Sequence, residues 1–278
     1  MSEKEQGAVA QEGERNFFDQ VSTLSLTIAP GKIRDLSFTA PFKVLRPFHA
    51  QDFLQIMVAK VSAGLMAGDR QELEIRLEDG ACAEFLSQSY EKIHRMERGK
   101  AKRIGTITVG RGAVLYYAPL PVLPFADSAF QSSFAIALAD ESSRLFYSDV
   151  LACGRAARQE RFAYRLYESR VRVRRADRLI YADHLRFAPQ AQDVSLEGFT
   201  GYEGCTHLGT FLFFGFPLEE EKLRGFAAAH IPEQVLWGVT RLASGDLCLK
   251  ALAQGSEPLV RLQQACKEFL GRKISTDI

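Results

Sequence analysis

The sequence predicts a mainly β fold made of many short strands, with two α-helices confined to its C-terminal half. Three observations support this fold class: short apolar runs recur between Gly, Pro and Asp residues, one run alternates strictly, and helical spacing begins only after about residue 217. Such recurrence is typical of a β-sandwich, a barrel or a solenoid-like stack. Because no fixed repeat period is present, periodicity alone does not choose among these three.

The clearest strand covers residues 72–78. Leu73, Ile75 and Leu77 alternate with charged residues, which is the period of a half-buried strand. Asp79-Gly80 follows and is a strong turn signal. Comparable runs predict further strands at residues 81–86, 104–109, 113–117, 134–138, 145–150, 171–173 and 179–182.

Two helices are expected late in the chain. Pro217 suits a first helical position, three glutamates follow it, and Pro232 ends the run. The second helix is predicted to begin at Ser256 as N-cap and to end at Gly271. Its apolar stripe consists of Leu259, Leu262, Cys266, Phe269 and Leu270.

The length of 278 residues favours one large domain at residues 17–278, preceded by a flexible polar tail at 1–16. A net charge of +1 gives no general attraction to nucleic acid or to anionic membranes. The five cysteines are scattered and form no CxxC pair, which favours free thiols in the cytoplasm. No apolar run approaches the roughly 20 residues that a membrane span requires.

The usual catalytic motifs are absent from the sequence: it has no Walker loop, no GxGxxG, no GxSxG and no HExxH. The five histidines are far apart and pair with neither His nor Cys, so a four-ligand zinc site is not supported. We therefore expect no enzymatic activity, although a catalytic triad assembled across the fold remains an alternative.

Three segments deserve a functional reading beside a structural one. Gly64 and Gly68 precede Asp69, whose carboxylate either serves a site or, the favoured reading, bonds its own turn. Prolines 119, 121 and 124 predict an extended crossing at a sheet edge, or else a ledge for a partner. Nine arginines between residues 149 and 178 form either a solvated face paired with acids, the favoured reading, or a docking face for an acidic protein patch.

The same segments resemble the UreD/UreH family of urease accessory proteins. The resemblance lies in VSAGLMAGD at 61–69, SQSYEKIH at 87–94, PLPVLPF at 119–125, GRAARQERF at 154–162, and KALA with GSEPL at 250–259. These motifs occur in order over roughly residues 40–270. Two departures stand out: many relatives carry doubled glycines where this chain has Ala63-Gly64 and Ala67-Gly68, and many carry glutamate where Asp149 stands.

The resemblance implies an all-β, helix-like stack with two helices, and a non-catalytic scaffold for urease maturation. Family members bind the accessory protein UreF, through it the GTPase UreG, and apo-urease, and nickel is thought to pass through the scaffold. No tightly bound cofactor is implied, since Ni²⁺ in transit needs oxygen or imidazole ligands that hold it weakly. The alternatives are an uncharacterised β-fold enzyme and a nucleic-acid-binding protein that uses the arginine stripe.

The resemblance, together with positions at strand ends, suggests where nickel would travel. We expect a polar route through the β body with Asp69, Asp149, Asp183 and His94 as transient metal ligands. Ser87 and Gln88 would line the same route. The expected UreF-binding residues are Leu259, Leu262, Phe269 and Leu270, for which packing on the chain's own β body is an equal alternative.

Overall fold

A computed structural model describes residues 21–50, 53–191, 195–198 and 201–274, so the tail expected at residues 1–16 lies outside the described part. These residues form two stacked sheets and two α-helices, which confirms the mainly β prediction. No helix in the described residues is long and apolar enough to cross a membrane.

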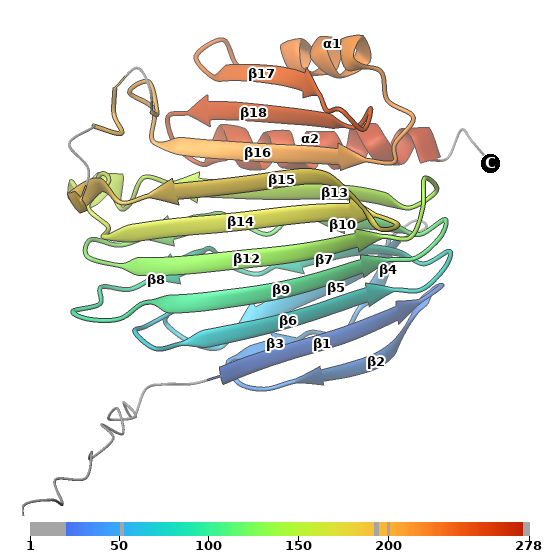
Figure 1. Ribbon diagram of the computed structural model, residues 1–278, viewed down its shortest axis with the longest axis horizontal. Helices are drawn as coiled ribbons and strands as arrows, with labels where there is room; N and C mark the ends of the chain where they lie inside the picture. The colour runs from blue at the N-terminus through green and yellow to red at the C-terminus, as the bar shows by residue number, and fades with distance from the viewer. Residues whose placement is uncertain (1–20, 51–52, 192–194, 199–200, 275–278) are drawn as a thin grey trace, which may run out of the picture.

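The front sheet of Figure 1 has the strand order β15-β14-β12-β9-β6-β1-β2. Its strands are β1 (Val21–Ala29), β2 (Lys32–Phe38), β6 (Arg70–Leu77), β9 (Ala101–Val109), β12 (Ala129–Leu138), β14 (Leu166–Arg175) and β15 (Arg178–Phe187).

The back sheet has the order β17-β18-β16-β13-β10-β7-β5-β3, with β4 and the small pair β8 and β11 attached to it. Its strands are β3 (Phe42–Val44), β4 (Phe48–Ala50), β5 (Phe53–Lys60), β7 (Cys82–Ser87), β8 (Glu91–Ile93), β10 (Val114–Tyr117), β11 (Val122–Pro124), β13 (Arg144–Ala152), β16 (His207–Phe214), β17 (Leu236–Arg241) and β18 (Leu247–Ala253).

From β5 to β14 the chain winds between the two sheets like a flattened coil. It passes from front to back through tight turns at residues 78–81, 110–113 and 139–143, and returns through longer segments at 61–69, 88–100, 118–128 and 153–165. Strands laid down this way are parallel within each sheet, as β6, β9, β12 and β14 are. This winding is the expected helix-like stack, and it separates a tight-turn end from a long-loop end.

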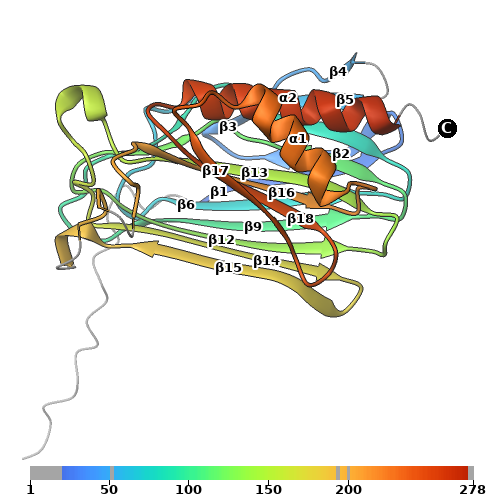
Figure 2. The same ribbon diagram turned by 90° about the horizontal axis from the view of Figure 1, so that it is seen from above.

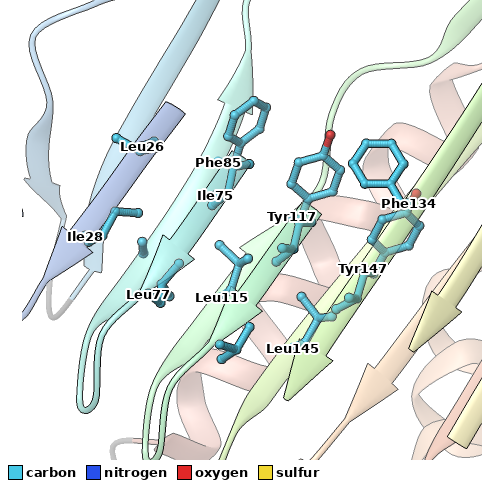
Figure 3. Packing of buried hydrophobic residues seen from close by; sticks show 14 of the residues in the cluster. Leu26, Ile28, Ile75, Leu77, Phe85, Leu115, Tyr117, Phe134, Leu145 and Tyr147 are labelled. Carbon is cyan, nitrogen blue, oxygen red and sulfur yellow. The ribbon is translucent and has the colours of Figure 1, made fainter. Parts of the chain in front are cut away.

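The interior between the sheets changes character along the strands. At the tight-turn end it consists of aliphatic side chains that are almost fully buried, each worth about 1.5–3 kcal/mol of transfer free energy. Toward the long-loop end aromatic rings replace them, as Figure 3 shows for Phe85, Tyr117, Phe134 and Tyr147. The aliphatic residues in that view are Leu26, Ile28, Ile75, Leu77, Leu115 and Leu145.

Helices α1 (Glu220–His230) and α2 (Glu257–Ile274) lie on the outer side of the back sheet, and within the described residues no α-helix covers the front sheet (Figure 2). Beneath them is a second apolar core that includes Phe146 and Phe211. Helix α2 continues past Gly271, contrary to the prediction. Gly271 does not take the positive φ that would end a helix, so the chain remains helical through it.

The proline-rich segment at 119–125 also differs from the expected edge crossing. Its strand β11 lies between β8 and β13 rather than at an edge. The prolines fit because they serve as acceptors, as when the Pro121 carbonyl accepts a hydrogen bond from the Glu91 amide at 3.0 Å.

Candidate functional site

The four long-loop connections meet and pair with one another. Leu65 forms a bridge with Ile93, and its amide donates to the Lys92 carbonyl at 2.8 Å. The Phe125 amide donates to the Ile93 carbonyl at 2.9 Å, which adds the third connection. Gly64 permits this approach, because it has φ +141° and a Cβ there would overlap the Lys92 carbonyl oxygen.

Arg155 joins the fourth connection to this cluster. Its guanidinium lies 3.9 Å from the centre of the Phe125 ring and makes two hydrogen bonds to the Glu160 carboxylate. Glu160 also accepts from the Ala126 amide at 3.2 Å. The hydrogen bond from Arg155 holds the pKa of Glu160 below its usual value. Four motifs far apart in sequence thus form one structural unit at the long-loop end.

Beneath this unit lies a polar cavity of about 50 Å³ between the two sheets, large enough for a few water molecules. The inward positions of the strands supply its polar groups, while Phe85, Phe130 and Phe134 form apolar parts of the wall. The polar lining consists of Lys60, Ser87, Ser89, Glu91, Arg103, Tyr117, Ser132, Tyr147, Asp149 and Tyr167.

Asp149 is the acidic centre of the cavity. Its side chain is half-buried and lines the cavity, and desolvation by burial raises the pKa of Asp149 to about 6. Arg103 and a hydrogen bond from Tyr167 oppose the rise, whereas nearby Asp183 adds to it. The carboxylate is therefore mostly ionised at neutral pH but easily protonated below it.

The tyrosines around Asp149 stay neutral. Burial raises the pKa of Tyr117 to about 12 and raises the pKa values of Tyr147 and Tyr167 well above their usual value. Their hydroxyls consequently act as uncharged donors and acceptors. One carboxylate among hydroxyls is a hard oxygen environment that suits a divalent cation held weakly.

A buried ionic network closes one side of the cavity. Both Lys60 and Arg103 contact the same oxygen, Oε2, of Glu91, whose side chain is 7% exposed. We did not single out these three residues from the sequence. The sequence did contain one signal. Side chains alternate between the two faces of a strand, so Arg103 lies on the same inward face of β9 as Ile107 and Val109, where an apolar residue is expected.

Two of the predicted site residues line this cavity, and four do not. Asp149 and Ser87 are on its wall, and the Ser87 hydroxyl accepts from the Leu120 amide at 2.7 Å. Gln88 is exposed on the surface. His94 lies outside the wall, where its Nε2 is 2.9 Å from the Ala63 carbonyl oxygen and its ring packs on Phe125.

The other two predicted carboxylates lie on either side of the cavity. Asp69 lines a separate surface pocket of about 240 Å³, and its Oδ2 accepts from the Met66 amide at 2.8 Å, which is the favoured structural reading. Asp183 is on the inward face of the edge strand β15, 3.3 Å from the Lys250 ammonium. Among the described residues no three His, Cys, Asp or Glu side chains gather closely enough to hold a metal ion.

The expected UreF-binding stripe lies in the second core. Leu259, Leu262 and Leu270 are at most 2% exposed, and the partly buried Phe269 stacks on Phe226. This arrangement matches the alternative of packing on the chain's own β body. The outward face of α2 is polar instead and presents Glu257, Arg261, Gln264 and Glu268.

The arginine segment divides into buried, paired and outward residues. Arg170 pairs with Glu168, and Arg161 pairs with Glu197, as expected for a face paired with acids. Arg172 and Arg174 point outward from β14 and form no ion pair within the described residues.

Comparison with known proteins shows which family this chain belongs to. Residues 24–276 match the family described as UreD urease accessory protein. The chain is 35% identical to the urease accessory protein UreH of Helicobacter pylori over 269 residues, which cover 95% of this chain and 100% of the relative. It is 36% identical to UreH of Helicobacter acinonychis, covering 88% and 91%, and 34% identical to UreD of Acetivibrio thermocellus, covering 92% and 99%.

Proposed function

We propose that this chain, which belongs to the UreD family of urease accessory proteins, is a non-catalytic scaffold that guides Ni²⁺ toward apo-urease. The observation that carries the proposal is Asp149, which lines the cavity beside tyrosine hydroxyls and, unlike Glu91 on the same wall, forms no ion pair within the described residues. Arg103 and the Tyr167 hydroxyl offset only part of the cost of burying this ionised group, so its retention beside open space favours a passing cation as its occupant.

The cavity suits transport better than storage. With Glu91 held by Lys60 and Arg103, Asp149 is the carboxylate of the lining that is left to bind a cation, and the lining contains neither thiolate nor imidazole to trap nickel. In this proposal Asp149 is a transient ligand on the nickel route. Asp183, beside Lys250, marks the side of the cavity on which the cation leaves or enters. UreF and, through it, UreG would deliver nickel in the cytoplasm, with apo-urease as receiver.

Nickel delivery tests the central claim. Asp149→Ala should lower the nickel content and the activity of co-expressed urease severalfold, while the variant still co-purifies with UreF and apo-urease. Asp177→Ala is the matched control, because it removes an exposed carboxylate in a turn at the opposite end. Full urease activation by Asp149→Ala would refute the proposal, and parallel Asp69→Ala and Asp183→Ala variants would show how far the route extends.

The proposed UreF-binding face is still α2 with the neighbouring β surface, but through outward side chains. Removing the helix would uncover the second core, so substitution is the better test. Replacing Arg261 and Gln264 together by alanine should weaken UreF capture without lowering thermal stability. Unchanged UreF capture would place that interface elsewhere.

A further inference from the structure

The ionic network is also the wall between the two polar pockets. Gln71 lines the surface pocket that holds Asp69, whereas Arg103 lines the cavity that holds Asp149. Arg103 donates to the Gln71 side-chain oxygen from Nε at 2.9 Å and from Nη2 at 2.7 Å. A cation moving from the surface pocket to the cavity by this route must therefore pass the network.

Charge makes this wall a barrier to cations. At the wall itself Lys60 and Arg103 bring two positive charges to the one carboxylate of Glu91, which is a local excess of one positive charge, while Asp149, which also interacts with Arg103, belongs to the cavity behind the wall. A divalent cation approaching through a desolvated passage is repelled by that excess far more strongly than it would be in water. Glu91, the one anionic ligand on the way, is occupied by Lys60 and Arg103.

The two basic residues are held differently. Arg103 is 10% exposed, is tied to Gln71 and Glu91, and lies 5.4 Å from the centre of the Phe130 ring. Lys60 is 23% exposed, stands at the end of β5 with its ammonium 5.7 Å from the centre of the Phe42 ring, and has Glu91 as its one ion-pair partner and no second side-chain hydrogen bond among the described residues. The flexible lysine stem can thus leave while the arginine stays.

We propose that Lys60 is the movable part of an electrostatic gate that controls cation entry from the Asp69 pocket into the Asp149 cavity. An arriving Ni²⁺ displaces the Lys60 ammonium from Glu91, binds that carboxylate while Arg103 stays fixed, and moves on to Asp149. Lysine then returns to Glu91 and blocks backflow. This inference rests on the proposed function, since it takes the cavity to be a nickel route.

The test uses the full chain with 3-fluorotyrosine in place of tyrosine. Paramagnetic Ni²⁺ in the cavity broadens the ¹⁹F signals of Tyr117, Tyr147 and Tyr167, which line it, and Mg²⁺ serves as diamagnetic reference. Lys60→Met should lower the Ni²⁺ concentration that gives half-maximal broadening by about tenfold or more. Lys60→Gln, which removes the charge but keeps a hydrogen-bond donor, should act in the same direction and covers a folding failure of the first variant.

Two matched controls locate the effect. Lys43→Met makes the same change on the outward side of the neighbouring strand β3 and should leave broadening unchanged. Lys250→Met makes it at the other side of the cavity, beside Asp183. If Lys250→Met lowers the nickel requirement and both Lys60 variants do not, or if no variant changes it, the gate is refuted.

The gate and the proposed function can fail separately. Adding Asp149→Asn to Lys60→Met should abolish the broadening, because the receiving ligand is lost. If it does so but Lys60→Met alone has no effect, the cavity binds nickel without this gate. If the gate responds as expected and Asp149→Ala still activates urease fully, the gate is real and the proposed function is wrong.

Discussion

Two buried ionic clusters occupy opposite ends of the same sandwich, and they are built differently. At the tight-turn end, Arg175 makes two hydrogen bonds to Asp246, at 2.8 and 3.0 Å, and an ion pair with Glu141. Asp246 also accepts from the Gly215 amide and the Ser244 hydroxyl. At the long-loop end, Lys60 and Arg103 share one oxygen of Glu91 beside a cavity.

The difference separates a cluster that only stabilises the fold from a cluster whose contacts can be exchanged. The Arg175 cluster sets two carboxylates, Asp246 and Glu141, against one guanidinium, uses both oxygens of Asp246, and contributes no residue to either pocket of the long-loop end. Such a pair is costly to break and has nothing to exchange with. The Glu91 cluster has surplus positive charge, one flexible member and space beside it, so its contacts can be exchanged. Burial alone does not distinguish the two clusters, whereas the sign of the local excess charge and the presence of adjacent space do.

The largest expected effect comes from disrupting the Arg175 cluster. Asp246→Ala should destabilise the protein by about 3–5 kcal/mol, because it leaves the buried Arg175 guanidinium with only the exposed Glu141 as its ion-pair partner. Urea unfolding followed by circular dichroism measures this. Asp177→Ala, an exposed carboxylate at the same end, should change stability by less than about 0.5 kcal/mol. Comparable losses in both variants would contradict the contrast drawn between the two clusters.

The sequence predicted the tight-turn end better than the long-loop end. Every strand expected from apolar runs is present, because alternation and Gly or Asp turns report directly on a sheet with one buried face. The starts of three front-sheet strands at the long-loop end, β9, β12 and β14, were missed by three to five residues. Strand β12 begins at Ala129, five residues before the predicted start, since Ser132 faces inward and interrupts the apolar pattern. The inward polar residues that interrupt the apolar pattern at these strand starts are also residues that line the candidate site.

The site itself was predictable only in part. Asp149 and Ser87 follow from the family resemblance, and both line the cavity. Lys60, Glu91 and Arg103 come from three strands, and their meeting depends on how the winding sets those strands beside one another. Local patterns do not encode that juxtaposition. Helix α2 shows the same limit, because an apolar stripe reads alike whether it faces a partner or the chain's own core.

A smaller effect, of opposite sign, is expected at the cavity. At neutral pH the folded protein carries Asp149 ionised although its pKa is about 6, roughly two units above that of an unfolded aspartate. Asp149→Asn should therefore stabilise the protein by about 1–3 kcal/mol at pH 7, while it impairs nickel delivery. Thermal melting and nickel content of urease measure the two quantities.

The pH dependence identifies the cause of that gain. Because the folded pKa is the higher one, the wild-type protein recovers stability as Asp149 is protonated, from about pH 7 down to about pH 4. The advantage of Asp149→Asn should shrink over this range and vanish below it. An advantage that stays constant with pH would mean that packing, and not the charge, separates the two proteins.

The smallest expected effect concerns Arg155, which joins Glu160 and Phe125 above the cavity. Arg155→Lys keeps the charge but removes the paired hydrogen bonds to Glu160 and the flat contact with Phe125. The loss should be about 1 kcal/mol, because the side chains on both sides of the ion pair keep partial contact with solvent. The loss should also be local: the Ala126 amide, which donates to Glu160, should exchange its hydrogen faster, while amides of β9 and β12 are unaffected.

The same substitution should show a pH dependence. The stability that Glu160 contributes through its lowered pKa is present at neutral pH and lost on acidification, so the stabilities of wild type and Arg155→Lys should converge at low pH. Faster exchange throughout the front sheet would show that the long-loop cluster supports the whole fold and is not a unit resting on it.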